Sequence, residues 1–167
     1  MKIAEGEVMI FVVLGTQKFP LNRLLKEIDD LVGSGKITEP VFAQIGWSDY
    51  IPQNFAFERF LEKSSFEEKI AECSMLITHS GVGTIVTGMR YGKPVVVFPR
   101  LKKYGEHVDD HQLEIAESFS ELNYVLLCKE EDDLEDILKK CSTHKFDKFI
   151  SKREKMITTI TDYLKTV

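Results

Sequence analysis

The sequence has no long apolar run, and this absence argues against a membrane-spanning protein. Stretches such as Val8 to Leu14 and Pro94 to Pro99 have the length of strands, well short of the roughly 20 residues that a spanning helix needs. The first residues, Met1 to Val8, include two acidic side chains and do not follow the basic, apolar, small-residue order of a signal peptide. We therefore expect a cytoplasmic protein.

Cysteines and basic clusters are also scarce. Cys73, Cys128 and Cys141 form no CxxC pair, so neither a disulfide framework nor a zinc cluster is indicated, and we expect no metal. Lys and Arg number 22 against 27 Asp and Glu, which gives a net charge of -5. Because nucleic acid binding needs grouped basic side chains, we expect no nucleic acid partner.

The residues that are present follow the pattern of an α/β protein. A chain of 167 residues suffices for one domain, residues 1–167, but not for two full nucleotide-binding halves. Apolar runs alternate with amphipathic segments, which predicts a doubly wound, mainly parallel, Rossmann-like sheet. The expected strands are Val8–Leu14, Val41–Ile45, Ala56–Phe60, Met75–Thr78, Pro94–Phe98 and Tyr124–Leu127. The expected helices are Pro20–Val32, Ser65–Cys73, Gly83–Tyr91, Asp109–Phe119, Glu131–Lys140 and Lys145 to about Leu164.

Ligands of such sheets bind beyond the carboxyl ends of the strands, where the fourth expected strand is followed by a glycine-rich loop. This loop reads His79-Ser80-Gly81-Val82-Gly83-Thr84 and opens a helix, whose free N–H groups and dipole favour an anion. Glycine lets the backbone approach a phosphate closely, and Ser80 and Thr84 add hydroxyl donors. The alternative is a tight turn in which Ser80 only caps the helix. Gly15 and Thr16 offer similar donors after the first strand.

Three other motif matches fail on their residues. Gly33 to Lys36 looks like the end of a P-loop, but Ile37 stands where Ser or Thr should bind magnesium, and a helix C-cap explains the glycines better. His107 and His111 have the spacing of a helical zinc pair, but the segment spans a loop and a helix start. The glycine-rich loop begins a dinucleotide fingerprint whose third glycine is replaced by Val86. A nucleoside diphosphate therefore fits better than NAD.

Taken together, these segments resemble the C-terminal domain of family 28 glycosyltransferases over nearly the whole chain. The resemblance is greatest to the small, donor-binding catalytic subunits of two-subunit UDP-sugar transferases, such as the dolichol-pathway N-acetylglucosaminyltransferase and bacterial exopolysaccharide and capsule transferases. It implies one half of a GT-B fold. The segments that carry the resemblance are Gly15-Thr16, Phe60-Leu61, Thr78 to Thr84, Gly92-Lys93-Pro94, Pro99-Arg100 and Gly105 to Gln112.

The resemblance also implies roles for individual positions. Backbone atoms near Phe60 and Leu61 would bind the uracil edge, and His111 and Gln112 would bind hydroxyls of the donor sugar, with Glu106 as a further catalytic candidate. Acidic residues at a helix start are often only dipole partners, and His79 is equally explained as a structural residue. The residues implied to hold the diphosphate are Gly15, Thr16, His79, Ser80, Gly81, Val82, Gly83 and Thr84.

A second half of the enzyme is implied by the same resemblance. These transferases close two domains around a cleft, so we expect a separate, membrane-associated subunit that binds a lipid-linked acceptor and recruits this chain to the cytoplasmic face of the membrane. The UDP-sugar is a substrate, and no cofactor is expected. Thr87 replaces a ribose-binding Glu of related one-chain enzymes, and no general base is evident. A non-catalytic nucleotide-binding regulatory subunit and a UDP-sugar epimerase-like enzyme remain alternatives.

The C-terminal segment, about residues 145–164, is a candidate for docking that partner. Its apolar residues recur at helical spacing. The first half can equally pack on its own domain, and the last turns are better placed for an interface. The residues are Phe146, Phe149, Ile150, Met156, Ile157, Ile160, Tyr163 and Leu164.

Overall fold

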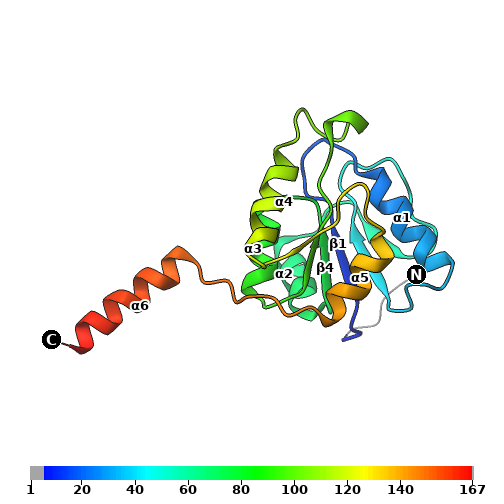
Figure 1. Ribbon diagram of the computed structural model, residues 1–167. Coiled ribbons are helices and arrows are strands. Elements are labelled where there is room, and N and C mark those ends of the chain that lie inside the picture. The colour runs from blue at the N-terminus through cyan, green and yellow to red at the C-terminus, as the bar shows by residue number, and fades with distance from the viewer. Residues whose placement is uncertain (1–5, 167) are drawn as a thin grey trace.

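The computed structural model describes residues 6–166, which form a six-stranded parallel sheet covered by helices, with a C-terminal helix, α6 (Lys152–Lys165), extending from it (Figure 1). The strand order is β3-β2-β1-β4-β5-β6, so the expected doubly wound sheet is confirmed. Residues 1–5, which belong to the stretch compared with a signal peptide, lie outside the described residues. The strands are β1 Ile10–Val13, β2 Val41–Gln44, β3 Ala56–Glu58, β4 Met75–Thr78, β5 Val95–Val97 and β6 Leu126–Leu127.

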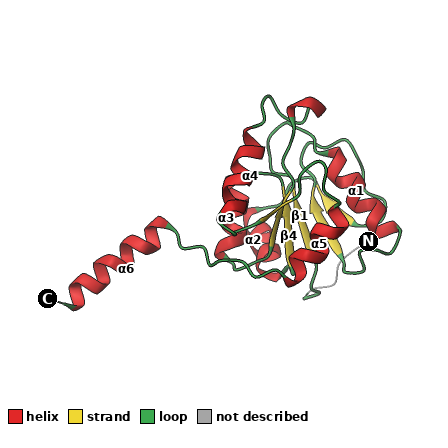
Figure 2. Ribbon diagram, in the orientation of Figure 1, coloured by secondary structure: helices red, strands yellow, loops and turns green. Residues whose placement is uncertain are grey.

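Helices cover both faces of this sheet (Figure 2). Side chains of α1 and α5 pack in the core on one face, and those of α2, α3 and α4 pack on the other. Apart from the start of α6, element ends differ from the expected ones by at most three residues, and β4 has the expected bounds. The helices are α1 Asn22–Gly33, α2 Lys63–Glu72, α3 Val82–Arg90, α4 His111–Glu121, α5 Leu134–Thr143 and α6 Lys152–Lys165, with a 3-10 turn at Lys102–Tyr104.

The central strand shows why an unbroken apolar run predicts this architecture. Ile10 and Val12 belong to the core beneath α1 and α5, whereas Phe11 and Val13 belong to the core on the opposite face. All four side chains are buried. Because each fully buried apolar side chain contributes roughly 1.5 to 3 kcal/mol, a strand covered on both faces has apolar residues at every position.

The change of direction in strand order places the functional loops. The chain turns to β2 on one side of β1 and to β4 on the other, and Val13 at the end of β1 pairs with Thr78 at the end of β4. Ligands of doubly wound sheets bind at such a switch point, beyond the carboxyl ends of the two strands. The loops that begin at Leu14 and His79 therefore leave the sheet side by side.

The helix expected from Lys145 is wrong at its start, because α6 begins only at Lys152. A capping box explains this boundary: the Ser151 hydroxyl accepts a hydrogen bond from the Glu154 N–H at 3.1 Å, and the Glu154 side chain binds the Ser151 N–H. The preceding residues are not helical. Phe146 and Phe149 nevertheless pack against the two core clusters, so this first part of the segment belongs to its own domain.

Candidate functional site

The loops after β1 and β4 are joined at the C-terminal edge of the sheet. The His79 N–H donates to Val13 O at 3.3 Å, and the Thr78 hydroxyl donates to the same carbonyl oxygen at 2.9 Å. These bonds fix the start of the glycine-rich loop against the end of β1. The structure therefore brings together the two loops that the sequence predicts as phosphate-binding.

The imidazole of His79 fills the space between two glycines. A Cβ atom at Gly15 would lie 2.4 Å from His79 Nε2, and a Cβ atom at Gly81 would lie 2.5 Å from His79 Cε1. Gly15 also has a φ of +74°, a conformation that other residues rarely adopt. Both glycines are therefore required for the ring to reach the space between the loops.

Hydrogen bonds determine which nitrogen of His79 carries the proton. The Arg100 backbone N–H donates to Gln112 Oε1 at 3.2 Å, which orients the amide so that Gln112 Nε2 faces His79 Nδ1 at 3.3 Å. Because an amide nitrogen only donates, Nδ1 accepts and the proton of the neutral ring lies on Nε2. Burial, assisted by the charge of Arg100, lowers the pKa of His79 to about 3. His79 therefore presents a neutral N–H donor between Gly15 and Gly81.

A buried hydroxyl and an uncapped helix add further donors. Ser80 is 2% exposed, and its Oγ has no hydrogen-bond partner among the described residues, although buried polar atoms are normally paired. Ser80 does not cap α3, because Gly81 occupies the N-cap position and no side chain caps this helix. The first turn of α3 contains no acidic residue, so nothing there offsets the positive end of the helix dipole. This arrangement suits an anion.

The outer part of the same loop is open. Val82 is 47% exposed, and a Cβ atom at Gly83 would meet nothing within 4 Å. Thr84 is half-buried, and Thr16 is exposed on the neighbouring loop. The hydroxyl of Thr87, the position that lacks the expected ribose-binding Glu, donates to Gly83 O at 2.8 Å. Thr87 therefore uses its hydroxyl within α3.

Two aromatic rings border the site on the side of β2 and β3. The Trp47 Nε1–H donates to Thr16 O at 3.2 Å, and its ring meets the Phe60 ring edge-on with centroids 5.8 Å apart. Trp47 is 49% exposed and Phe60 is 44% exposed. The loop after β2 can lie this close to the loop after β1 because residue 46 is a glycine: a Cβ atom at Gly46 would lie 2.7 Å from Gly15 O. The loops after β1, β2 and β3 thus form one continuous rim.

One backbone donor at the predicted base-binding position is already occupied. The Leu61 N–H donates to Gln44 Oε1 at 3.0 Å. Recognition of a base by this N–H would require the Gln44 side chain to release it. The uracil contact at Phe60 and Leu61 therefore stays a prediction, with the Leu61 N–H engaged in the described structure.

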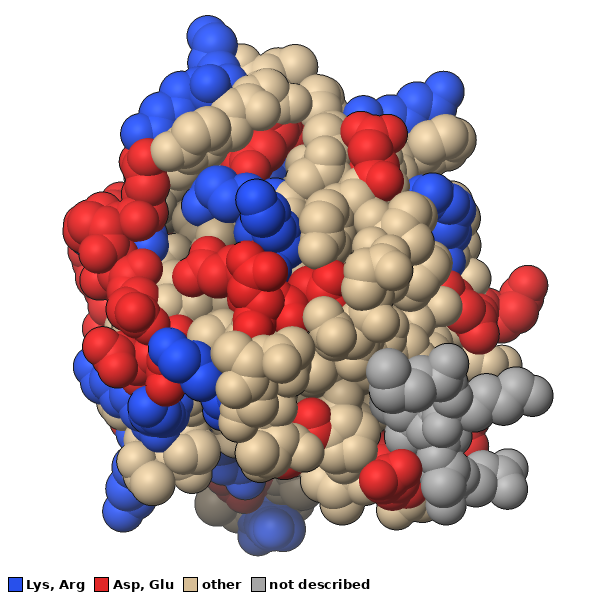
Figure 3. Space-filling model, turned by 90° about the vertical axis from the view of Figure 1, so that its right-hand side faces the viewer, with Lys and Arg blue, Asp and Glu red and all other residues tan. Residues whose placement is uncertain are grey.

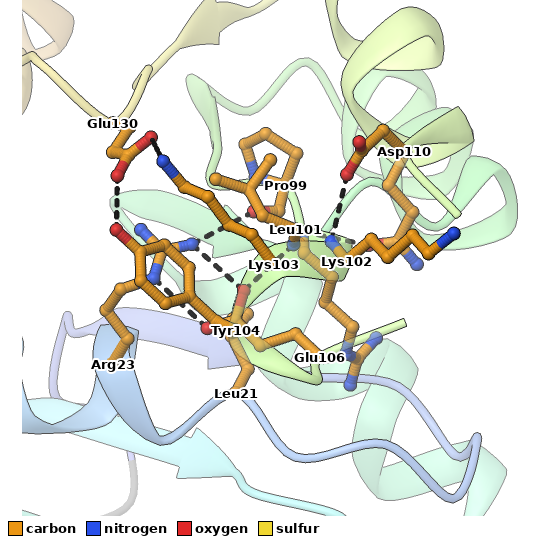
Figure 4. A network of polar contacts seen from close by, with 12 residues as sticks. Leu21, Arg23, Pro99, Leu101, Lys102, Lys103, Tyr104, Glu106, Asp110 and Glu130 are labelled. Carbon is orange, nitrogen blue, oxygen red and sulfur yellow. Dashed lines mark hydrogen bonds and ion pairs between the residues drawn. The ribbon is translucent and has the colours of Figure 1, made fainter. Parts of the chain in front are cut away.

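Glu106 lies inside the fold, where it joins α1 to the loop after β5 (Figure 4). It is 4% exposed, and its carboxylate accepts hydrogen bonds from Arg23 Nε at 3.1 Å, from Arg23 Nη2 at 3.0 Å and from the Leu101 N–H at 2.9 Å. The Arg23 guanidinium also lies over the rings of Phe98 and Tyr104. These contacts make Glu106 a support for the loop, and a catalytic role for it stays a prediction.

The tip of this loop is also held by the loop after β6. Lys103 and Tyr104 both contact the Glu130 carboxylate, which follows β6 (Figure 4). A hollow of ≈ 370 Å³ lies beside this contact, lined by Leu101 and Cys128 among others.

Lys and Arg side chains lie among Asp and Glu side chains on the face shown in Figure 3. That face therefore carries charges of both signs and no broad basic patch.

The structure separates the two residues predicted to bind the sugar. The His111 side chain is 70% exposed, and the carboxylates of Glu114 and Asp109 raise its pKa above 6.5. Gln112 is 6% exposed and is engaged with Arg100 and His79. His111 is accessible to a ligand, whereas Gln112 supports the site from within.

Sequence reasoning left Arg100 without a role, although it is the largest fully buried side chain described. Its Nη2 donates to Leu14 O at 2.6 Å and to Phe19 O at 3.0 Å. The sequence offered one signal for such a role: Arg100 is a charged residue that directly follows an apolar strand and Pro99. Burial of that charge became visible only in the structure.

Residues 6–166 contain no group of three or more His, Cys, Asp or Glu side chains that could hold a metal ion. Within the same range, no helix combines the length and apolar character needed to cross a bilayer.

Comparison with known families and proteins is consistent with this geometry. Residues 9–167 match the model of the glycosyltransferase family 28 C-terminal domain. The UDP-N-acetylglucosamine transferase subunit ALG13 of Candida albicans is 34% identical over 67 residues, which cover 40% of this chain and 22% of that protein. The Homo sapiens protein of that name is 26% identical over 135 residues, covering 71% of this chain and 11% of its own length. The chain thus spans only a small part of these relatives.

Solved structures show a related fold. The crystal structure of the glycotransferase of kitacinnamycin superposes with a TM-score of 0.61 at 19% sequence identity. The superposition covers 85% of this chain and 36% of that one. The fold of most of this chain therefore corresponds to one part of a larger GT-B glycosyltransferase.

Proposed function

Because this chain belongs to the family of glycosyltransferase family 28 C-terminal domains, we propose that it is the donor-binding catalytic subunit of a two-subunit UDP-sugar transferase. The sugar would pass to a lipid-linked acceptor, for which we propose a polyprenyl-diphosphate-linked sugar in polysaccharide or glycolipid synthesis. The unpaired Ser80 Oγ, beside the neutral His79 and the uncapped start of α3, carries this proposal. A diphosphate has enough acceptor oxygens to satisfy these donors together.

The neighbouring loops support a nucleotide over a simple anion. The exposed rings of Trp47 and Phe60 lie on the rim beside Thr16, and aromatic faces are suitable surfaces for a base or ribose. The two ALG13 relatives are named as subunits of a UDP-N-acetylglucosamine transferase. UDP-N-acetylglucosamine is therefore the first donor to test.

In the proposed mechanism, the acceptor hydroxyl attacks the anomeric carbon while the bond from that carbon to the UDP oxygen breaks. Negative charge grows on the departing diphosphate. The His79 Nε2–H, the Ser80 hydroxyl and the N–H groups at the start of α3 would stabilise this charge, because they are fixed donors that need little reorganisation. Glu106 is occupied by Arg23, so we propose that the partner supplies the general base.

The partner would dock on α6, which projects from the sheet (Figure 1). Residues 152–166 are all exposed, and isolated helices shorter than about 12 to 15 residues are marginally stable in water. Five apolar side chains lie on one side of α6, each more than half exposed. These are Met156, Ile157, Ile160, Tyr163 and Leu164. An acceptor-binding, membrane-associated subunit covering this face would stabilise the helix and bring the chain to the cytoplasmic face of the membrane.

Calorimetry with UDP, ADP and NAD tests the donor site directly. We expect UDP to bind and the other two nucleotides to bind at least about tenfold more weakly, because ADP shares the ribose and diphosphate of UDP, and both ADP and NAD carry adenine where UDP carries uracil. Ser34→Ala, at the exposed end of α1, is a control that should bind as the unaltered chain does. A folded chain that does not bind UDP would refute the proposal.

A further inference from the structure

Arg100 is a buried cation that no contacting carboxylate of the described residues neutralises. It is 1% exposed, its Nε and Nη1 have no hydrogen-bond partner among residues 6–166, and it takes part in none of the ion pairs that those residues form. Burying an unpaired charge is costly. Such a group is therefore expected to have a counter-charge in the working state of the protein.

Among the described residues, the carboxylate whose charge acts on Arg100 is already engaged. Burial lowers the pKa of Arg100 to about 10, and the negative charge of Glu106 opposes this shift. The carboxylate oxygens of Glu106 accept hydrogen bonds from the Arg23 guanidinium and from the Leu101 N–H. Arg23 and Glu106 thus neutralise each other, and the positive charge of Arg100 remains.

Hydrogen bonds connect Arg100 to both anion-binding loops. Its Nη2 binds Leu14 O and Phe19 O, the carbonyl groups on either side of the loop that contains Gly15 and Thr16. Its backbone N–H binds Gln112, whose amide in turn binds His79. The uncompensated charge therefore lies directly behind the donors of the candidate site.

We propose that Arg100 is a positioning residue of the donor site whose missing counter-charge is the diphosphate of the bound nucleotide. The guanidinium holds the first loop by bridging its two ends, and its charge adds a fixed positive potential at the phosphates. A diphosphate supplies the negative charge that the fold lacks there. A planar guanidinium suits both tasks better than an ammonium group, since it can donate to two carbonyls and keep further donors free. This inference rests on the proposed function.

The test separates a phosphate effect from a loss of structure. The affinities of uridine, UMP and UDP are measured for the unaltered chain, Arg100→Met and Arg100→Lys. In Arg100→Met we expect the ratio of UDP to uridine affinity to fall about 10- to 100-fold, the range of one charge-assisted interaction. Arg100→Lys should retain more of this ratio, because it keeps the charge. Leu138→Ala, in the core beneath α5, controls for destabilisation and should leave the ratio unchanged.

Each outcome has a defined meaning. An unchanged ratio in a folded Arg100→Met, or an equal fall for uridine and UDP, would overturn the inference and leave Arg100 a structural staple. Equal losses in the Lys and Met variants would overturn the role of its charge. If Arg100→Met does not fold, the comparison of Arg100→Lys with Leu138→Ala decides, since only the former should change the ratio. Failure of the unaltered chain to bind UDP would instead contradict the proposed function.

Discussion

The Ser80 side chain contributes less to the stability of the protein without nucleotide than its buried position suggests, because its hydroxyl has no partner among the described residues. Ser80→Ala removes this unpaired group, so we expect the free energy of unfolding to stay the same or rise by up to about 1 kcal/mol. The affinity for UDP should fall about tenfold, the effect of one lost hydrogen bond to a charged group. Urea unfolding and calorimetry measure the two effects. A loss of stability without a loss of affinity would show that the hydroxyl serves the fold.

A substitution at Gly83 is expected to change stability and UDP binding in opposite directions. A Cβ atom there meets nothing in the free protein, and Ala in place of Gly stabilises a helix by up to about 1 kcal/mol. We therefore expect Gly83→Ala to raise the melting temperature and to weaken UDP binding, because the added methyl group occupies the space that a phosphate would approach. The control is Gly88→Ala, which should destabilise the fold because its Cβ atom would lie 2.6 Å from a Leu76 methyl group. Unchanged UDP affinity in Gly83→Ala would place the phosphates elsewhere.

His79 makes stability depend on pH. Its pKa falls from 6.5 to about 3 in the folded chain, chiefly through burial. A depressed pKa gives stability that is complete above pH 6.5 and is lost as the pH falls toward 3, with a limiting slope of about 1.4 kcal/mol per pH unit. Urea unfolding between pH 7 and pH 5 should therefore show a steeper loss for the unaltered chain than for His79→Gln. Parallel profiles would mean that His79 does not titrate in this way.

The sequence was sufficient to single out residues with local conformational requirements and insufficient for residues that act through distant partners. Gly15 and Ser80 stand out because turns and helix starts have local chemical requirements. Arg100 reaches Leu14 across 86 positions, and Arg23 reaches Glu106 across 83 positions. No spacing rule relates residues so far apart, so the engagement of Glu106 and the burial of Arg100 required the three-dimensional structure.

At the scale of elements, periodicity located the strands and helices but not every boundary. The apolar run of β1 predicts a buried parallel strand because both faces are covered. In the C-terminal segment, Phe146 and Phe149 fit a helical period although they lie in a non-helical stretch. They face opposite core clusters, which two residues spaced by three would not do on one helix face. The Ser151 cap, and not the apolar period, determines where α6 begins.

The exposed face of α6 yields a prediction with a matched control. Ile160 lies at the centre of the apolar side and is 52% exposed, whereas Thr158 projects from roughly the opposite side of the helix by its 3.6-residue turn. Ile160→Asp should weaken capture of the acceptor-binding subunit in pull-down assays by about tenfold or more. Thr158→Asp should not. Neither change should affect UDP binding, because no side chain of α6 is buried.

A truncation provides the complementary experiment on the same element. A chain that ends at Met156 lacks most of the apolar face of α6 but keeps Phe146 and Phe149, which pack on the core. Its melting temperature should stay close to that of the full chain. Retained capture of the partner by this truncated chain would refute docking through α6.

At the scale of the whole molecule, nucleotide binding and sugar transfer are expected to depend on different subunits. The described fold supplies donors for a diphosphate on the loops after β1 and β4, while the carboxylate of Glu106 is engaged with Arg23. Without a general base the acceptor hydroxyl is a weak nucleophile, and a positioned base contributes typically 10²- to 10⁴-fold in rate. The isolated chain should therefore bind UDP but transfer sugar at least about 100-fold more slowly than the complex with its acceptor-binding subunit.

A transfer assay on both forms decides between the candidate functions. UDP-N-acetylglucosamine and other UDP-sugars are incubated with a polyprenyl-diphosphate-linked acceptor, with the chain alone and with the co-expressed partner. Ser80→Ala in the complex should lower kcat/KM for the donor, since the variant weakens binding of the departing diphosphate. Unchanged kcat/KM in that variant would indicate a regulatory subunit whose nucleotide site is not the catalytic one. Conversion of the UDP-sugar without acceptor would indicate an epimerase, and full turnover by the isolated chain would remove the need for a second subunit.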